Sequence, residues 1–274
     1  MMDVVGVITA MAVEGNVFRS AWGLKAMDTG GPFRCYGDDD RILVISGSGK
    51  VRCASAAAWL LSQFPEIRDG VLLNAGIAGS GSLEIGSAHI IHQAVDTATD
   101  RRLYPDILFT HPYGEATLHT VDKPVDKRTA GMGEDDLIDM EGAAFLQAAQ
   151  LWMPCHRTHL VKVISDNLAP DQVDRGDIAR LMENALPAVE HIIGAVSCDR
   201  EQSDMDKRME VFTRIGERWR LTMSQRAQLH RTGRAWLLRH PDGEFPWPGD
   251  MDAPRDKQSR NQALADLIDR LWEG

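Results

Sequence analysis

The chain has 274 residues, which is enough for one large α/β domain and a smaller additional piece. It has 40 acidic and 30 basic residues, and because residues 201–274 carry equal numbers of each, the net charge of −10 belongs to residues 1–200. This acidity argues against nucleic acid as a ligand of the main domain and points to a small molecule.

The first part of the chain alternates apolar runs with one Ala-rich helix. Val4–Ala10 and Val71–Gly76 are continuous apolar runs, typical of strands buried on both faces. Residues 31–37 and 42–46 flank a polar Asp cluster and predict a hairpin. Val51–Phe64 predicts a helix that ends before Pro65.

The middle of the chain is less regular. Residues 76–81 are rich in glycine and predict a turn, and Ala88–Val95 predicts a strand. Residues 97–117 show no periodicity and are expected to form a long irregular loop, which in a compact domain is commonly a lid or a binding loop. Leu118–Val125 predicts a short strand.

The remaining elements complete an α/β pattern. We expect helices at Glu141–Trp152 and Val173–Val196, with a strand at Leu160–Ile164 between them. Strands joined by helices predict a three-layer α/β/α sandwich with a mixed central sheet, formed by residues 1–198. Residues 199–274 differ in composition, with basic residues concentrated in 207–239, and predict a small α-helical extension whose role the sequence does not reveal.

Three acidic residues stand where strands and helices meet. Glu14 follows the first strand, Glu141 begins an apolar helix, and Asp166 follows the strand at Leu160–Ile164. Side chains at such junctions point into crevices of α/β folds, so these acids are candidates for a site. The alternative is that each acid only caps a helix.

Two glycine-rich stretches lie beside these junctions. Residues 46–50 read Ser-Gly-Ser-Gly-Lys, but they lack the spacing of a Walker phosphate-binding loop, and residues 76–81 lack the dinucleotide-binding spacing. Both stretches are compatible with tight turns or with close approach of the backbone to a ribose or an attacking water.

Five sequence blocks together resemble the purine nucleoside phosphorylase superfamily, and most closely its 5′-methylthioadenosine/S-adenosylhomocysteine nucleosidases. The blocks occur in the order of that family over residues 3–196, and nothing in the resemblance covers residues 201–274. They are residues 11–14, 46–51, 74–79, 139–144 and 163–166.

The resemblance implies a role for each matching residue. Glu14 would orient and deprotonate an attacking water, Glu141 would bind the ribose 2′-hydroxyl, and Asp166 would protonate the purine as general acid. The other implied contacts with the substrate come from Met140 beneath the sugar, from Ile77, Ala78 and Gly79 near the sugar and water, and from Ser165. Pro124 and Val125 are expected beside the base, where this chain lacks the aromatic residue of the methylthioadenosine enzymes.

This set of acids suits cleavage of an N-glycosidic bond. Positive charge develops on the sugar and negative charge on the departing base, so carboxylates near the sugar and a protonated acid near the base both help. The phosphorylases of the superfamily hold phosphate with arginines, whereas the matching positions here are Glu14 and Asn74, with Ile77 in place of a serine. Hydrolysis of a purine nucleoside, unmodified or 5′-modified, is therefore the favoured function. A phosphate-dependent phosphorylase and a non-catalytic nucleoside-binding or regulatory protein are the alternatives.

The sequence also sets expectations about surroundings and partners. It contains no apolar run long enough for a membrane span and no signal-peptide pattern, and its four cysteines are scattered, so we expect a cytoplasmic protein. The histidines show no metal-ligand spacing, and we expect neither a metal nor another cofactor. The expected ligand is a small-molecule nucleoside, and the resemblance implies a homodimer or higher homo-oligomer.

Overall fold

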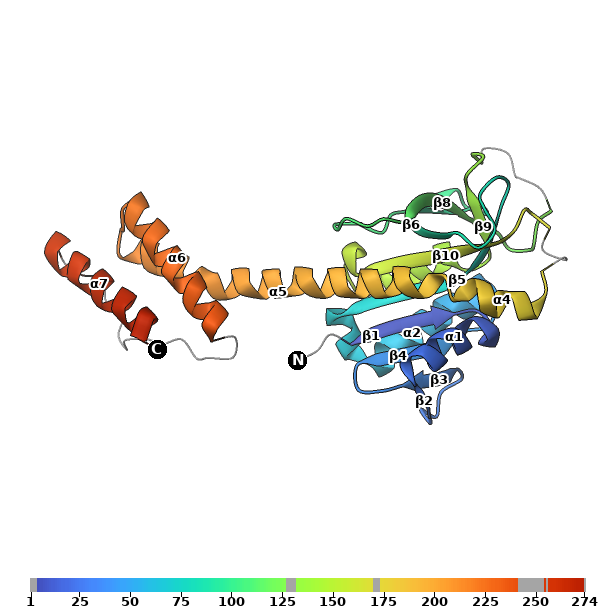
Figure 1. Cartoon of the computed structure of the whole chain (residues 1–274), viewed down its shortest axis with the longest axis horizontal. Coiled ribbons are helices and arrows are strands. Elements are labelled where there is room, and N and C mark those ends of the chain that lie inside the picture. The colour runs from blue at the N-terminus through green and yellow to red at the C-terminus, as the bar shows by residue number, and fades with distance from the viewer. Residues whose placement is uncertain (1–3, 127–131, 170–172, 241–253, 255, 274) are drawn as a thin grey trace. The chain divides into compact units, whose positions relative to one another are not determined.

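The computed structural model of the chain describes residues 4–126, 132–169, 173–240, 254 and 256–273. The chain divides into two compact units, Met1–Ser197 and Cys198–Gly274. The boundary falls within one long helix, α5 (Ala185–Arg218), which is drawn in orange in Figure 1. Across the described residues, no helix combines the length and the apolar character needed to span a bilayer.

One half of the sheet in the first unit is open and is built on a fully buried strand. Each residue of β1 is buried, which explains its uninterrupted apolar sequence. Strand β1 pairs in parallel with β4 and with β5, while β3 pairs antiparallel with both β4 and β2. The strands of this half are β1 (Val5–Thr9), β4 (Arg41–Ile45), β3 (Arg34–Gly37) and β2 (Lys25–Met27).

The other half of the sheet closes on itself. Strand β5 pairs with β10 on one side and with β9 on the other. Strand β10 also pairs with β6, β6 pairs with β8, and β8 pairs with β9, so these five strands form a closed ring. A short strand, β7, adds to the edge of β6. These strands are β5 (Val71–Ser80), β6 (Ala88–Asp96), β7 (Arg101–Leu103), β8 (Gly114–Thr120), β9 (Leu137–Asp139) and β10 (Thr158–Asp166).

Helices cover both faces of the sheet and enclose two hydrophobic cores. One core contains α2 and α3 with residues such as Leu60 and Phe145, and the other contains α1, α4 and the start of α5 with residues such as Phe18 and Ile192. The predicted three-layer α/β/α arrangement with a mixed sheet is therefore confirmed (Figure 1). The helices are α1 (Ala12–Trp22), α2 (Lys50–Gln63), α3 (Gly142–Ala149) and α4 (Arg175–Met182), with 3₁₀ turns at Pro65–Asp69 and Cys155–Arg157.

Two predictions about strands were wrong, and the single helix expected at Val173–Val196 is instead two helices, α4 and α5. Residues 76–81 do not form a turn after β5, because β5 continues to Ser80 and is held there by β10 and β9 on its two sides. Residues 97–117 are not wholly irregular, since they contain β7 and the start of β8, which ends at Thr120. In both places, pairing with strands far away in the sequence outweighs local glycine content and weak periodicity.

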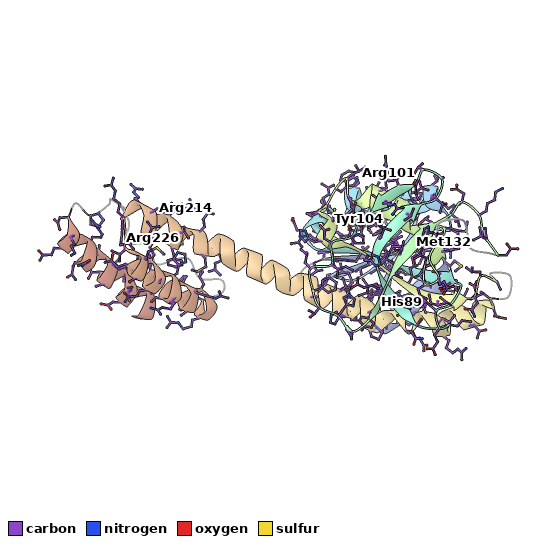
Figure 2. All side chains as sticks on the ribbon, turned by 90° about the horizontal axis from the view of Figure 1, so that it is seen from above. His89, Arg101, Tyr104, Met132, Arg214 and Arg226 are labelled. Atoms are coloured by element: carbon purple, nitrogen blue, oxygen red, sulfur yellow. The ribbon has the colours of Figure 1, made fainter. Side chains whose placement is uncertain are left out.

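The second unit is helical and has a core of its own. Helices α6 (Met223–Arg239) and α7 (Lys257–Glu273) join the end of α5 around buried side chains that include Phe212, Trp219 and Leu267. Thr222 caps α6 through a reciprocal pair of hydrogen bonds with Gln225. Basic side chains such as Arg214 and Arg226 belong to this unit (Figure 2).

Candidate active site

A cavity of about 230 Å³ lies in the first unit, at the ends of β1, β5 and β10. The structure brings all ten predicted site residues to its walls, from five separate parts of the chain. These residues are Glu14, Ile77, Ala78, Gly79, Pro124, Val125, Met140, Glu141, Ser165 and Asp166. The other lining residues, for which the sequence predicted no individual role, are Ala10, Met11, Ser48, Val121, Ile138, Asp139 and Leu168.

Glu14 stands in the first turn of α1 and is only 2% exposed. Its carboxylate accepts hydrogen bonds from the backbone N–H of Met11 (2.7 Å) and, across the sheet, from that of Ile77 (3.0 Å). Burial raises the pKa of Glu14, although these two donors and the nearby Lys162 ammonium oppose the rise. Glu14 therefore caps α1 and also holds a carboxyl group against β5 at the cavity wall.

Glu141 occupies the N-cap position of α3, but its side chain does not cap that helix. Instead, one carboxylate oxygen accepts a hydrogen bond of 2.6 Å from the backbone N–H of Gly49. Burial, followed by repulsion from Asp139, raises the pKa of Glu141 to about 7, against the attraction of Lys162. The capping alternative therefore does not explain Glu141, which lines the cavity.

Asp139, and not Glu141, caps the N-terminus of α3. Its Oδ2 accepts the Gly142 N–H (2.8 Å), and its Oδ1 accepts the hydroxyl of Thr120 (2.7 Å), which itself accepts the Ala143 N–H. The same Oδ2 lies 2.9 Å from the ammonium of Lys162. Asp139 thus ties β8, α3 and β10 together at one edge of the cavity.

Lys162 is a buried lysine that the sequence analysis missed. It lies in the middle of β10 and is 1% exposed. Burial works against its charge, but Asp139, Glu141 and Glu14 outweigh burial and raise the pKa of the ammonium group. The signal in the sequence was a single charge inside a run of buried strand residues, where lysine is almost never found without partners.

Gly76 allows this group of charges to assemble. A Cβ atom at this position would lie 3.0 Å from Glu14 Oε1 and 3.5 Å from Lys162 Nζ. The glycine therefore leaves room for the carboxylate and the ammonium above the backbone of β5. Its role is close approach within the strand, not the turn predicted from the sequence.

Ser165 and Asp166 are neighbours in sequence, yet both line the cavity. The pairing of β10 with β5 is irregular between Ile164 and Asp166, and a bulge of this kind lets successive side chains face the same side. Asp166 accepts hydrogen bonds from the Ala169 N–H (2.7 Å) and from the Ser165 hydroxyl (2.6 Å). The backbone then turns sharply, with Leu168 at a φ of 59°.

Residues 47–49 contact the site through their backbone. Gly47 and Gly49 have φ values of 83° and 101°, which glycine adopts without strain, and Gly49 presents its N–H to Glu141. The next residue, Lys50, is not a free cation for phosphate, because Asp96 and Asp122 bind its ammonium group. In the part of the chain that the structure describes, no cluster of three or more His, Cys, Asp or Glu residues could hold a metal ion.

Comparison with solved structures identifies the fold. The 5′-methylthioadenosine/S-adenosylhomocysteine nucleosidase from Neisseria meningitidis, solved with methylthio-immucillin-A, superposes with a TM-score of 0.57 and 22% identity over 70% of this chain and 99% of that one. The Helicobacter pylori enzyme, solved as a point mutant with 5′-methylthioadenosine in the active site, gives 0.56 and 16% over 71% and 99%. The futalosine hydrolase of H. pylori, also solved as a mutant, gives 0.56 and 16% over 70% and 99%.

This chain has the nucleoside phosphorylase-like fold. The sequence itself matches no protein-family model, and no curated protein matches it. At identities of 16–22%, the superpositions establish the fold alone. The chemistry of this chain therefore depends on the side chains at its own cavity.

Proposed function

We propose that this protein hydrolyses the N-glycosidic bond of a purine nucleoside, either unmodified or modified at the 5′ position. The observation that carries the proposal is the convergence of three carboxyl groups, from Glu14, Glu141 and Asp166, on one cavity. Water attacks the anomeric carbon, the bond from that carbon to the purine nitrogen breaks, and the products are a free base and a ribosyl sugar.

Each acid has a distinct task in this reaction. Glu14 takes a proton from the attacking water, and Glu141 accepts a hydrogen bond from the 2′-hydroxyl and stabilises the cationic sugar. Asp166 gives its proton to the departing purine, so that the base leaves as a neutral molecule. Lys162 does not line the described cavity and acts from behind it, where it offsets the mutual repulsion of Glu14, Asp139 and Glu141.

The charges around the cavity favour water over phosphate as the nucleophile. Glu14, Asp139, Glu141 and Asp166 line the described cavity, and none of its lining residues is lysine or arginine. The nearby Lys162 ammonium is already bound to Asp139. A phosphate dianion would therefore meet carboxylates without a free cation, and desolvation makes such an arrangement expensive.

A nucleoside panel tests the proposal directly. Purified protein is incubated with purine nucleosides and their 5′-alkylthio and 5′-carboxyalkyl derivatives, with and without phosphate, and released base is quantified by chromatography. Base release without phosphate is the expected result. A strict requirement for phosphate would assign the reaction to the phosphorylases, and tight nucleoside binding with no base release would indicate a binding protein.

The pKa of Glu141 leads to a specific pH dependence. A hydrogen-bond acceptor for the 2′-hydroxyl works best as a carboxylate, and the pKa of this group is raised to about 7. We therefore expect kcat/KM to rise with pH and to level off above about pH 8. Glu141→Gln should lower kcat/KM and remove this rise, whereas a wild-type profile already flat between about pH 5 and pH 8 would contradict the role of Glu141.

The raised pKa of Glu141 also predicts that the free energy of unfolding falls as the pH rises, whereas activity should increase. The folded protein holds the Glu141 proton more tightly than the unfolded chain, whose pKa is near 4.5. The stabilisation from this group is complete below that value and is lost as the pH rises through about 7. Stability and activity should therefore change in opposite directions over this range.

A further inference from the structure

Lys50 is a charged residue near the cavity that the proposed reaction does not use. It is the first residue of α2, directly after Gly49. A cation is unfavourable there, because the N-terminus of a helix carries partial positive charge. A residue that breaks a local rule of this kind usually has a compensating role elsewhere, so its contacts are informative.

The Lys50 side chain joins two carboxylates from different elements. Its ammonium lies 2.5 Å from Asp96 Oδ1, at the end of β6, and 3.0 Å from Asp122 Oδ1, just beyond β8. The side chains of Lys50 and Asp96 are 15% and 16% exposed, so solvent screens this pair only in part. Burial works against the charge on Lys50, but both acids outweigh it and raise the pKa of the ammonium group.

Asp96 is itself firmly held. It accepts hydrogen bonds from the Ala98 N–H (3.2 Å) and from the Thr99 hydroxyl (2.8 Å). Asp122, in contrast, is 65% exposed, and Lys50 is the partner that the structure shows for its carboxylate. Lys50 is therefore anchored through Asp96 and restrains Asp122.

Both ends of this link lie next to residues that line the cavity. On one side, Gly49 donates its N–H to Glu141, the acid assigned to the sugar. On the other side, Val121, Pro124 and Val125 line the cavity immediately around Asp122, and we call these three residues the base wall. The bond from Lys50 to Asp122 therefore connects the base wall with the loop whose Gly49 N–H binds Glu141.

We propose that Lys50 is a positioning residue that holds the base wall at the width required for the purine. This inference rests on the proposed function, because it assigns Val121, Pro124 and Val125 to the base. Removing the ammonium leaves Asp96 and Asp122 to repel each other, and the base wall then moves outward. Substrate binding should suffer more than bond cleavage, since Glu14, Glu141 and Asp166 keep their own hydrogen bonds.

The experiment measures KM and kcat on the best nucleoside of the panel. The variants are Lys50→Met, Lys50→Arg, Asp122→Asn and the double variant Lys50→Met/Asp122→Asn, with Lys123→Met as a control. For Lys50→Met we expect KM to rise by about tenfold while kcat changes by less than about threefold. Lys50→Arg restores the charge and both contacts, and it should return KM to near the wild-type value. Asp122→Asn should raise KM on its own but add little in the Lys50→Met background, because the two residues act through one link.

Lys123→Met is the matched control. Lys123 is exposed, follows Asp122 directly and does not line the cavity, so this variant changes the local charge without breaking the link. Its KM should equal that of the wild type. A lower melting temperature for Lys50→Met with unchanged KM would show that Lys50 serves stability alone and would overturn the inference.

Binding of adenine, measured by calorimetry, separates this inference from the proposed function. If the wild type turns nucleosides over but Lys50→Met keeps the wild-type KM and adenine affinity, the inference fails and the function stands. If the wild type releases no base but binds adenine, and Lys50→Met weakens that binding about tenfold, the link stands while the hydrolytic function falls. If the wild type neither releases base nor binds adenine, both are overturned.

Discussion

Replacement of Asp166 by Asn is expected to lower kcat on purine nucleosides by about 10²–10⁴-fold, the usual contribution of a general acid. The amide cannot deliver the proton that the departing purine needs. The fold should survive, because the amide oxygen can still accept the Ala169 N–H and the amide NH₂ can donate to the Ser165 hydroxyl. Turnover is measured as base release under saturating nucleoside.

The leaving group provides a sharper test of the same residue. A ribofuranoside of p-nitrophenol departs without protonation, so Asp166→Asn should reduce its hydrolysis much less than that of a purine nucleoside. Glu14→Gln, which affects the attacking water, should slow both substrates. Equal losses on both substrates for Asp166→Asn would mean that Asp166 does not act as the acid.

The second large effect is expected for Lys162→Met. The substitution removes the cation and leaves Asp139, Glu141 and Glu14 close together in the interior. Breaking a buried ion pair by removing one partner destabilises proteins by about 3–5 kcal/mol. We expect this loss in the first unit, because Lys162 lies in the middle of β10.

The measurement must report on the first unit alone, since the chain has two compact units and unfolding need not be two-state. Hydrogen exchange of β10 and β5 amides across a urea series meets this requirement. Lys162→Arg, which keeps the charge, serves as the control and should lose much less stability. A Lys162→Met protein with wild-type protection would show that the charges are balanced by other groups.

The sequence could predict the three acids because each follows a strong local signal. The apolar run of β1 marks Glu14, the apolar start of α3 marks Glu141, and the buried strand β10 marks Asp166. The α/β layering follows from the same alternation of buried strands and helices. These features depend on residues close together in the chain.

The parts that the sequence could not predict depend on distant pairing. The unusual position of Lys162 inside a buried strand is visible in the sequence, but its pairing with Asp139 is visible only in the structure. Strand β9 has only three residues and is defined by β5 and β8 on its two sides. The extension of β5 to Ser80 likewise requires its neighbours, because its glycines favour a turn when considered alone.

The bulge at the end of β10 makes this pocket sensitive to chain length. One additional residue in the strand allows both Ser165 and Asp166 to line the cavity. A regular strand would direct only one of the two side chains toward it. A single-codon deletion at this point is therefore expected to remove Asp166, the proposed proton donor, from the cavity while the hydrophobic interior remains intact. Among proteins that share this architecture, insertions and deletions at this strand end should mark changes of chemistry more clearly than overall similarity does.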